Sequence, residues 1–150
     1  MRFPGDARAA AGGVPSGPPR ETEYRPRHPL DLRRVLLFQR RGYGDPTHTD
    51  AQPVIWRACR TPAGVATIAI REVAGGAVRG AAWGPGAEWA IAQLPALCGR
   101  DDDLEGFDAS LHPLIAETHR RNPGLRLGRT DLVFDALAGA IIEQKVTGKQ

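Results

Sequence analysis

The sequence predicts an α+β fold in which a small antiparallel sheet is flanked by helices. Between residues 54 and 84, three β-rich runs alternate apolar and polar positions with a period of two. Short loops that contain glycine separate the runs, which is typical of hairpins and predicts a three-stranded meander. On both sides of the runs the apolar residues recur with a helical period. A sheet of this size needs such helices to cover it.

The composition is that of an ordinary globular protein with a mildly basic charge. The chain has 150 residues, of which 41% are hydrophobic and 25% are charged, and its formal net charge is +3. Such a charge permits a polyanionic partner without requiring one. Of the 20 basic residues only Lys145 and Lys149 are lysines. This preference for arginine is expected from a GC-rich genome, and it also suits phosphate recognition by guanidinium groups.

The cysteines and the apolar runs exclude several classes of protein. Cys59 and Cys98 form neither a disulfide framework nor a zinc-binding pattern, so we expect two free thiols and no metal or cofactor. The apolar stretch near the N-terminus is too short for a signal peptide. No run approaches the roughly 18 apolar residues of a membrane span. We therefore expect a cytoplasmic protein without membrane contact.

The first ordered element is expected to be a helix that Asp31 caps. Residues 1–29 are rich in Pro, Gly, Ala and Arg without an apolar period, which predicts a disordered tail. From Asp31 onward, Leu32, Val35 and Leu36 follow a helical stripe that Gly42 and Gly44 end. A turn-rich loop is expected over residues 44–53.

The strands of the meander are expected at residues 54–61, 65–73 and 77–84. Within them Ala66, Ile68 and Ile70 share one face of the second strand. The tryptophans of the chain are expected in or near the core, as aromatic residues at strand and helix spacing usually are; they are Trp56, Trp83 and Trp89.

Helices are expected again after residue 86. Pro95 should kink or split the first of them, and the acidic run 101–103 should be a solvated connector. Ser110 is expected to cap a helix over 111–121, and Thr130 or Asp131 to cap the last one. The stripe of this last helix consists of Val133, Leu137, Ala140, Ile141 and Gln144. The division into domains is expected at residues 30–108 and 109–150.

The C-terminal segment carries the most specific sequence signal. Residues 122–127 read NPGLRL, and they are followed by FDALAGAIIEQ over residues 134–144 and by VTGK over 146–149. This phrasing resembles the start of the helical domain in bacterial 3-methyladenine DNA glycosylases of type II. The order of elements upstream is also similar to the N-terminal α+β domain of that family. The resemblance implies an α+β domain followed by the first helices of a helix-hairpin-helix glycosylase domain, incomplete within these 150 residues.

The resemblance implies a function in base-excision repair of DNA. Family members hydrolyse the N-glycosidic bond of alkylated bases such as 3-methyladenine in double-stranded DNA, after the nucleotide has been turned out of the stack. The full-length protein would be a monomer associated with the nucleoid. The catalytic aspartate of the family and its glycine-rich hairpin have no match here. We therefore expect no catalytic residue in this chain and no activity from it alone.

The resemblance also implies where the chain contacts DNA. The matching positions are Gln144 and Lys145, with Thr147 and Lys149 beyond them, and Phe38 matches an aromatic near the base pocket. Each has a simpler interpretation as well. Gln144 could bond a helix end, the two lysines could be solvated, Thr147 could cap a helix, and Phe38 could pack in the core. Glu143 and Lys145 depart from the residues common at these places.

Two further patterns were weighed against ordinary structural roles. The histidines, His28, His48, His112 and His119, are expected at the surface because no ligand set accompanies them. The segment Asp45–His48 is expected to form a turn rather than an acid–base pair. The alternative for the whole chain is a non-enzymatic nucleic-acid-binding or protein-interaction module complete at 150 residues. The glycosylase hypothesis predicts that the stripe of residues 133–144 is partly exposed.

Overall fold

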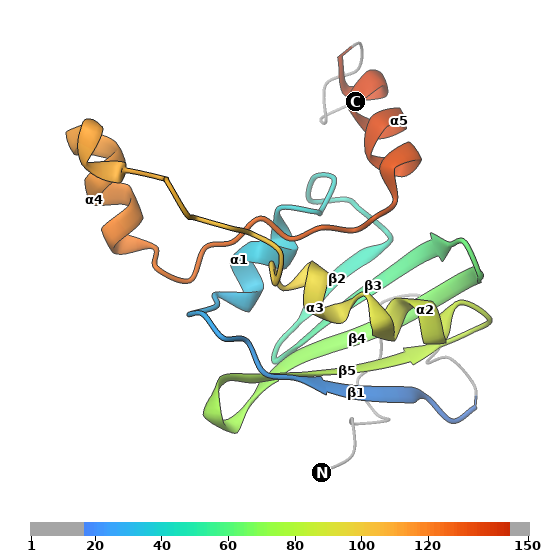
Figure 1. The fold of residues 1–150 in the computed structure, drawn as a ribbon. Helices are drawn as coiled ribbons and strands as arrows, with labels where there is room; N and C mark the ends of the chain where they lie inside the picture. Colours follow the sequence, from blue (N-terminus) through green and yellow to red (C-terminus); the bar gives the residue numbers. More distant parts are fainter. Residues whose placement is uncertain (1–16, 145–150) are drawn as a thin grey trace.

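The fold is an α+β arrangement built on one five-stranded antiparallel sheet (Figure 1). The structure is a computed structural model and describes residues 17–144. The strand order is β1-β5-β4-β3-β2. The elements are β1 (Arg20–Tyr24), α1 (Leu32–Leu37), β2 (His48–Ala51), β3 (Val54–Thr61), β4 (Gly64–Val73), β5 (Ala77–Trp83), α2 (Ala87–Ala92), α3 (Leu94–Leu97), α4 (Pro113–Arg121) and α5 (Val133–Glu143).

The predicted meander is confirmed, and each of its edges carries one more strand. Strands β3, β4 and β5 pair in succession, with Ile55 opposite Ile70 and Ile68 opposite Ala82. The expectation of a disordered tail over 1–29 is wrong for residues 20–24, because β1 pairs with β5 and places Arg20 opposite Ala82. Residues 1–16 lie outside the described part. The predicted loop over 44–53 contains β2, which pairs with β3.

The main core lies between the sheet and the helices α1, α2 and α3. Because side chains alternate along a strand, Ile68 and Ile70 of β4 share this face with Val78 of β5. Gly80 leaves room for α3, since a Cβ there would lie 2.9 Å from Cδ2 of Leu94. The buried residues of this core are Leu32, Leu36, Ile55, Ala66, Ile68, Ile70, Val78, Ala82, Ala87, Ala90, Leu94, Leu97 and Cys98.

A second, smaller cluster lies on the opposite face of the sheet. The rings of Trp56 and Trp83 stack there, with centroids 5.7 Å apart and planes inclined by 23°. Ala69 on β4 and Ala81 on β5 lie opposite each other in the same cluster. Both are completely buried. The expectation that these two tryptophans are core residues is confirmed, and Trp89 on α2 is half-buried.

The helix ends follow the predicted signals in part. The carboxylate of Asp31 caps α1 by accepting a hydrogen bond from the backbone N–H of Arg34 at 3.1 Å. Residues 94–97 form a separate helix in which Pro95 stands in the first turn, so the predicted split is confirmed. The expectation that Ser110 caps the next helix is wrong. Helix α4 begins at Pro113, and Nδ1 of His112 accepts from the N–H of Leu114 instead.

The last helix begins slightly later than expected. Helix α5 starts at Val133, after Leu132, and neither Thr130 nor Asp131 caps it with its side chain. The hydroxyl of Thr130 accepts a hydrogen bond from the N–H of Leu132 at 3.2 Å. Asp131 has a positive φ of 54°, a conformation that aspartate adopts more readily than most residues.

Residues 122–131, which we call the strap, run in extended form back across the helices of the α+β domain (Figure 1). The carbonyl of Gly124 accepts from the N–H of Asp31 at 2.7 Å, and the N–H of Arg129 donates to the carbonyl of Ala96 at 2.9 Å. Two glycines allow this approach. A Cβ on Gly124 would lie 2.6 Å from the nitrogen of Asp31, and one on Gly128 would overlap the carbonyl of Leu97.

Helices α4 and α5 project away from the sheet on either side of the strap (Figure 1). Their apolar side chains are largely exposed, so the predicted exposure of the stripe over residues 133–144 is confirmed. The exposed apolar residues of these helices are Leu114, Ile115, Val133, Phe134, Leu137, Ile141 and Ile142. Among residues 17–144, no helix has the length and apolar character needed to cross a membrane.

Candidate nucleic-acid interface

The chain leaves α1 through residues 38–44, FQRRGYG, which we call the arginine loop. Phe38 is the C-cap residue of α1 and its N–H donates to the carbonyls of Arg34 and Leu36. Its side chain is 74% exposed, so the interpretation of Phe38 as a core residue is wrong. The side chain of Tyr43 is also turned to solvent. The role of Phe38 in a base pocket stays a prediction.

Asp45 closes the arginine loop by binding its backbone. The carboxylate accepts hydrogen bonds from the N–H of Arg41 at 3.0 Å and from the N–H and hydroxyl of Thr47 at 2.8 and 2.6 Å. The predicted turn over Asp45–His48 is thereby confirmed. Partial burial opposes ionisation of this carboxyl group, but the hydrogen bonds from Arg41 and Thr47 outweigh it and lower the pKa of Asp45.

Two arginines of the loop are held by backbone carbonyl groups. The guanidinium group of Arg40 donates to the carbonyl of Tyr43 and lies 5.6 Å from the centroid of its ring. This is a cation–π distance. The guanidinium group of Arg41 donates to the carbonyl of Asp135 in the first turn of α5. Gly139, one turn further on, has no side chain where that guanidinium group lies.

A buried polar cluster supports the loop from below. Nη1 of Arg57 on β3 donates to Oε1 of Gln39 at 2.8 Å. Next to it His48 is buried, so the expectation of a surface histidine is wrong for this residue. Burial and the neighbouring charge of Arg57 lower the pKa of His48. A neutral ring at this position fits the positively charged surroundings.

Of the predicted DNA-contacting residues, Gln144 lies at the far end of α5. Gln144 is the C-cap residue of that helix and is exposed. Lys145, Thr147 and Lys149 lie outside the described residues. From Gly139, where Arg41 touches α5, to Gln144 is five residues, which corresponds to about 7.5 Å along the helix axis. The arginine loop thus contacts the same short helix that ends at the predicted DNA contact.

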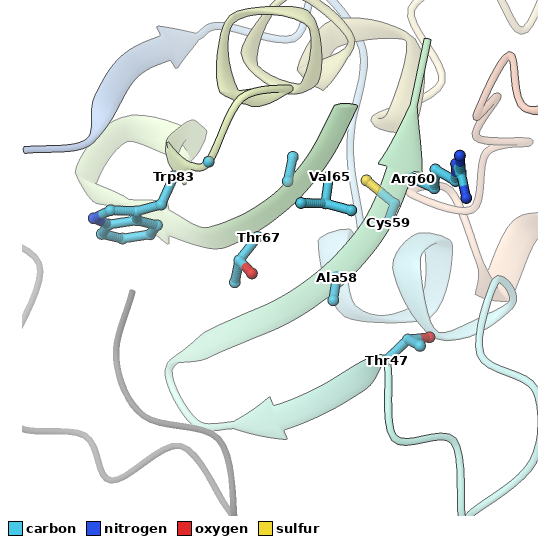
Figure 2. Close-up of a pocket in the computed structure, with 9 residues that line it drawn as sticks. Thr47, Ala58, Cys59, Arg60, Val65, Thr67 and Trp83 are labelled. Carbon is cyan, nitrogen blue, oxygen red and sulfur yellow. The ribbon is translucent and has the colours of Figure 1, made fainter. Parts of the chain in front are cut away.

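Two hollows open on the surface of residues 17–144, and the second is lined by the acidic residues Asp31 and Glu72 as well as by arginines. One of about 320 Å³ lies on the sheet face that carries Trp83. Figure 2 shows Trp83 and Thr67 at one side of it and Thr47 at another. Its other lining residues are Ala58, Cys59, Arg60, Val65, Ala66 and Gly84. The second, of about 450 Å³, lies between α1 and the strap.

Metal-ligating groups and thiols do not form a site in the part of the chain that the structure describes. Over residues 17–144 no three side chains of His, Cys, Asp or Glu are grouped so that they could hold a metal ion. Cys59 and Cys98 are free thiols. Burial raises the pKa of Cys98 to about 12, which makes this thiol a poor nucleophile at neutral pH.

Comparison with known proteins adds no assignment to this geometry. No model of a protein family matches the chain, and no curated protein matches it. The resemblance to glycosylases therefore depends on the residues themselves.

Sequence reasoning did not select Arg40, Arg41 or Tyr43 as candidate residues. The helical pattern accounts for Gly42 and Gly44 as the stop signal of the first helix and gives the two arginines no separate role. A signal for them was present, because the aromatic residues Phe38 and Tyr43 flank two arginines and one glycine. Such interleaving is typical of segments that bind nucleic acids.

Proposed function

We propose that this chain belongs to a DNA N-glycosylase of base-excision repair, which removes alkylated bases such as 3-methyladenine and of which the chain is a non-catalytic N-terminal part. One observation carries the proposal. The segment that resembles the glycosylases, residues 122–144, consists of a strap fixed by glycines and a helix whose apolar side chains are exposed. This is the arrangement that a first helix awaiting partner helices should have.

The exposed side chains of α5 support the proposal on energetic grounds. Val133, Phe134 and Leu137 are each more than half exposed, and so are Ile141 and Ile142. Burial of apolar surface is favourable by about 25 cal/mol per Å². Burial of these large side chains would therefore be favourable, and packing against further helices would bury them. The exposed apolar residues of α4 have the same need.

Four aspartates of the chain have structural partners, which supports a catalytic centre in another part of the protein. Hydrolysis of an N-glycosidic bond in this family uses an aspartate beside the extruded base. Asp31 and Asp108 cap helical turns, Asp45 closes the arginine loop, and Asp50 forms an ion pair with Arg33. These carboxylates have structural partners, and Asp31, which lines the hollow between α1 and the strap, is engaged by Arg34.

The proposal is tested by measuring base release from methylated duplex DNA. Two polypeptides are compared, the product of the complete reading frame and residues 1–150 alone, and released 3-methyladenine is quantified by chromatography. We expect release by the former and none by the latter. Release by residues 1–150 would place the chemistry in this chain, and no release of any alkylated base by the complete product would refute the proposed function.

The exposed apolar faces of α4 and α5 also favour a second candidate, a non-enzymatic interaction module. Such a module would use these faces to bind another protein. The same experiment distinguishes the two, because a module of this kind would form a stable complex and release no base.

A further inference from the structure

The arginine loop, residues 38–44, presents aromatic rings to solvent in an unusual way. The side chain of Tyr43 is 98% exposed. Phe38 at the other end of the loop is largely exposed too. Large aromatic side chains bury far more often than this in packed proteins. Two exposed rings within seven residues therefore indicate a surface that takes a flat apolar partner.

The positive charges of this loop are not neutralised by ion pairs. Within the described residues no carboxylate lies in an ion pair with Arg40 or Arg41, whose guanidinium groups donate to carbonyl oxygens instead. Other arginines of the chain do have carboxylate partners; they are Arg25, Arg33, Arg34, Arg79, Arg100, Arg120, Arg121 and Arg129. Since a guanidinium group has five N–H donors, a single carbonyl leaves several for phosphate oxygens.

The carboxylates near the loop do not cancel its charge. Asp45 directs its oxygens at the loop backbone, as described above. Asp135 lies at the start of α5, beside Arg41. Against these two carboxylates stand Arg40, Arg41 and, underneath, the guanidinium group of Arg57. His48 adds no negative charge, so the loop remains positive overall.

The loop is also placed beside the predicted DNA contact. Arg41 touches α5 at Asp135 and Gly139, and the same helix ends at Gln144. Figure 1 shows the segment after α1 and the start of α5 on one side of the sheet domain. A DNA strand bound at Gln144 would therefore lie at the end of a helix that the arginine loop itself contacts.

We propose that the arginine loop is a second DNA-binding element, in which Arg40 and Arg41 bind backbone phosphates and Tyr43 stacks on an unpaired base. The proposal rests on the proposed function in that the partner is DNA, and it extends the interface from the end of α5 to the sheet domain. Aromatic rings accept any base face, so the loop recognises strand distortion and not sequence. It therefore prefers a duplex with an extrahelical base to a fully paired one.

The test is a fluorescence anisotropy titration of residues 1–150 against a labelled duplex that carries one unpaired nucleotide. The variant R40Q/R41Q is expected to bind about tenfold or more weakly, and to reduce the slope of log K against log salt by about two, because each lost phosphate contact removes about one. Tyr43→Ala is expected to weaken binding about tenfold, as loss of one stacked base does, while Tyr43→Phe retains it.

The matched control is R120Q/R121Q, which removes two arginines that are ion-paired with Glu117 on α4. It should bind as the parent chain does. Equal losses in both double variants would reduce the effect to general charge and overturn the proposal. Unchanged binding by R40Q/R41Q, or no binding of the duplex by the parent chain, would overturn it as well. The proposed glycosylase function is tested separately by base release and survives each of these outcomes.

Circular dichroism and urea midpoints establish that each variant is folded. Arg40→Gln alone replaces the double variant if the latter is not folded, since Arg41 also contacts α5.

Discussion

Leu94 on α3 and Leu114 on α4 carry the same side chain but differ in how far it is buried. Leu94 is completely buried against the sheet, whereas Leu114 is 66% exposed on a helix that leaves the domain. The contrast extends to whole elements. Helices α1 to α3 contribute six buried residues to the main core, while the apolar residues of α4 and α5 are largely exposed. The difference lies in whether other elements cover these side chains.

This comparison separates what is stable in the chain from what needs a partner. The sheet and helices α1 to α3 bury their apolar side chains in the two clusters described above. Helix α5 is tied to that unit mainly through the strap and the contact of Arg41 with Asp135. We therefore expect substitutions in the two regions to have very different costs.

The largest difference is expected between Leu94→Ala and Leu137→Ala. Truncation of a fully buried leucine costs about 2–5 kcal/mol because a cavity remains. Leu137 is more than half exposed on α5, so the same truncation there should change stability by no more than about 0.5 kcal/mol. Urea unfolding followed by tryptophan fluorescence measures both. A cost for Leu137→Ala equal to that of Leu94→Ala would show that α5 is packed and would remove the distinction.

The next effect is expected at the strap. Gly128→Ala places a methyl group onto the carbonyl of Leu97 and within 3.1 Å of Val35, and such overpacking typically costs about 1–3 kcal/mol. Gly44→Ala is the matched control, because a Cβ there meets nothing within 4 Å. Thermal unfolding of the two variants should differ clearly. Equal midpoints would mean that the strap is not held against α3.

A smaller effect is expected from the cap of α1. Asp31→Ala removes the acceptor for the N–H of Arg34 and should destabilise the chain by about 1 kcal/mol. Asp31→Ser keeps an oxygen at this place and should retain most of the stability. The same urea titration resolves the two. If both variants lose equal stability, the carboxylate acts through its charge and not as a cap.

The smallest effect is expected from pH. Since the pKa of His48 is lowered in the folded chain, the unfolded chain binds the extra proton, and stability falls as pH decreases below the unfolded value of about 6.5. The slope is limited to about 1.4 kcal/mol per pH unit. Urea midpoints between pH 7.5 and 5.5 measure it, and His48→Gln is expected to flatten the profile. An unaltered profile in His48→Gln would contradict the burial of a neutral ring.

The sequence predicts those elements whose signals are local. In strands β3, β4 and β5 apolar and polar residues alternate with a period of two, so the three strands could be located. Asp31 caps the helix that follows it and Pro95 interrupts the helical segment in which it stands, so these helix ends could be located too. Strand β1, RETEY, was missed because its outward positions are charged, as is common in edge strands that must avoid pairing with other chains. Strand β2 was missed because it is short and stands in a turn-rich segment.

The candidate site depends on contacts that no local pattern encodes. Arg41 and Asp135 are 94 positions apart in the sequence, and only the folded strap brings them together. Exposure is equally hidden. Phe38 stands at the end of the predicted first helix, where core packing is the simpler interpretation, yet α1 ends just before it and its side chain faces solvent. The resemblance pointed to the end of α5, and the structure adds the neighbouring loop.

The hydrogen bond from the N–H of Leu127 to the carboxylate of Asp102, at 3.1 Å, closes the base of a long excursion of the chain. Gly99 packs against Arg126 at the same place. Residues 103–126, which include α4, extend away from the sheet domain, and the two ends of this segment lie close together. Surface excursions with adjoining ends accept insertion and shortening well. The length and direction of this segment can therefore change in evolution while the fold of the sheet is retained.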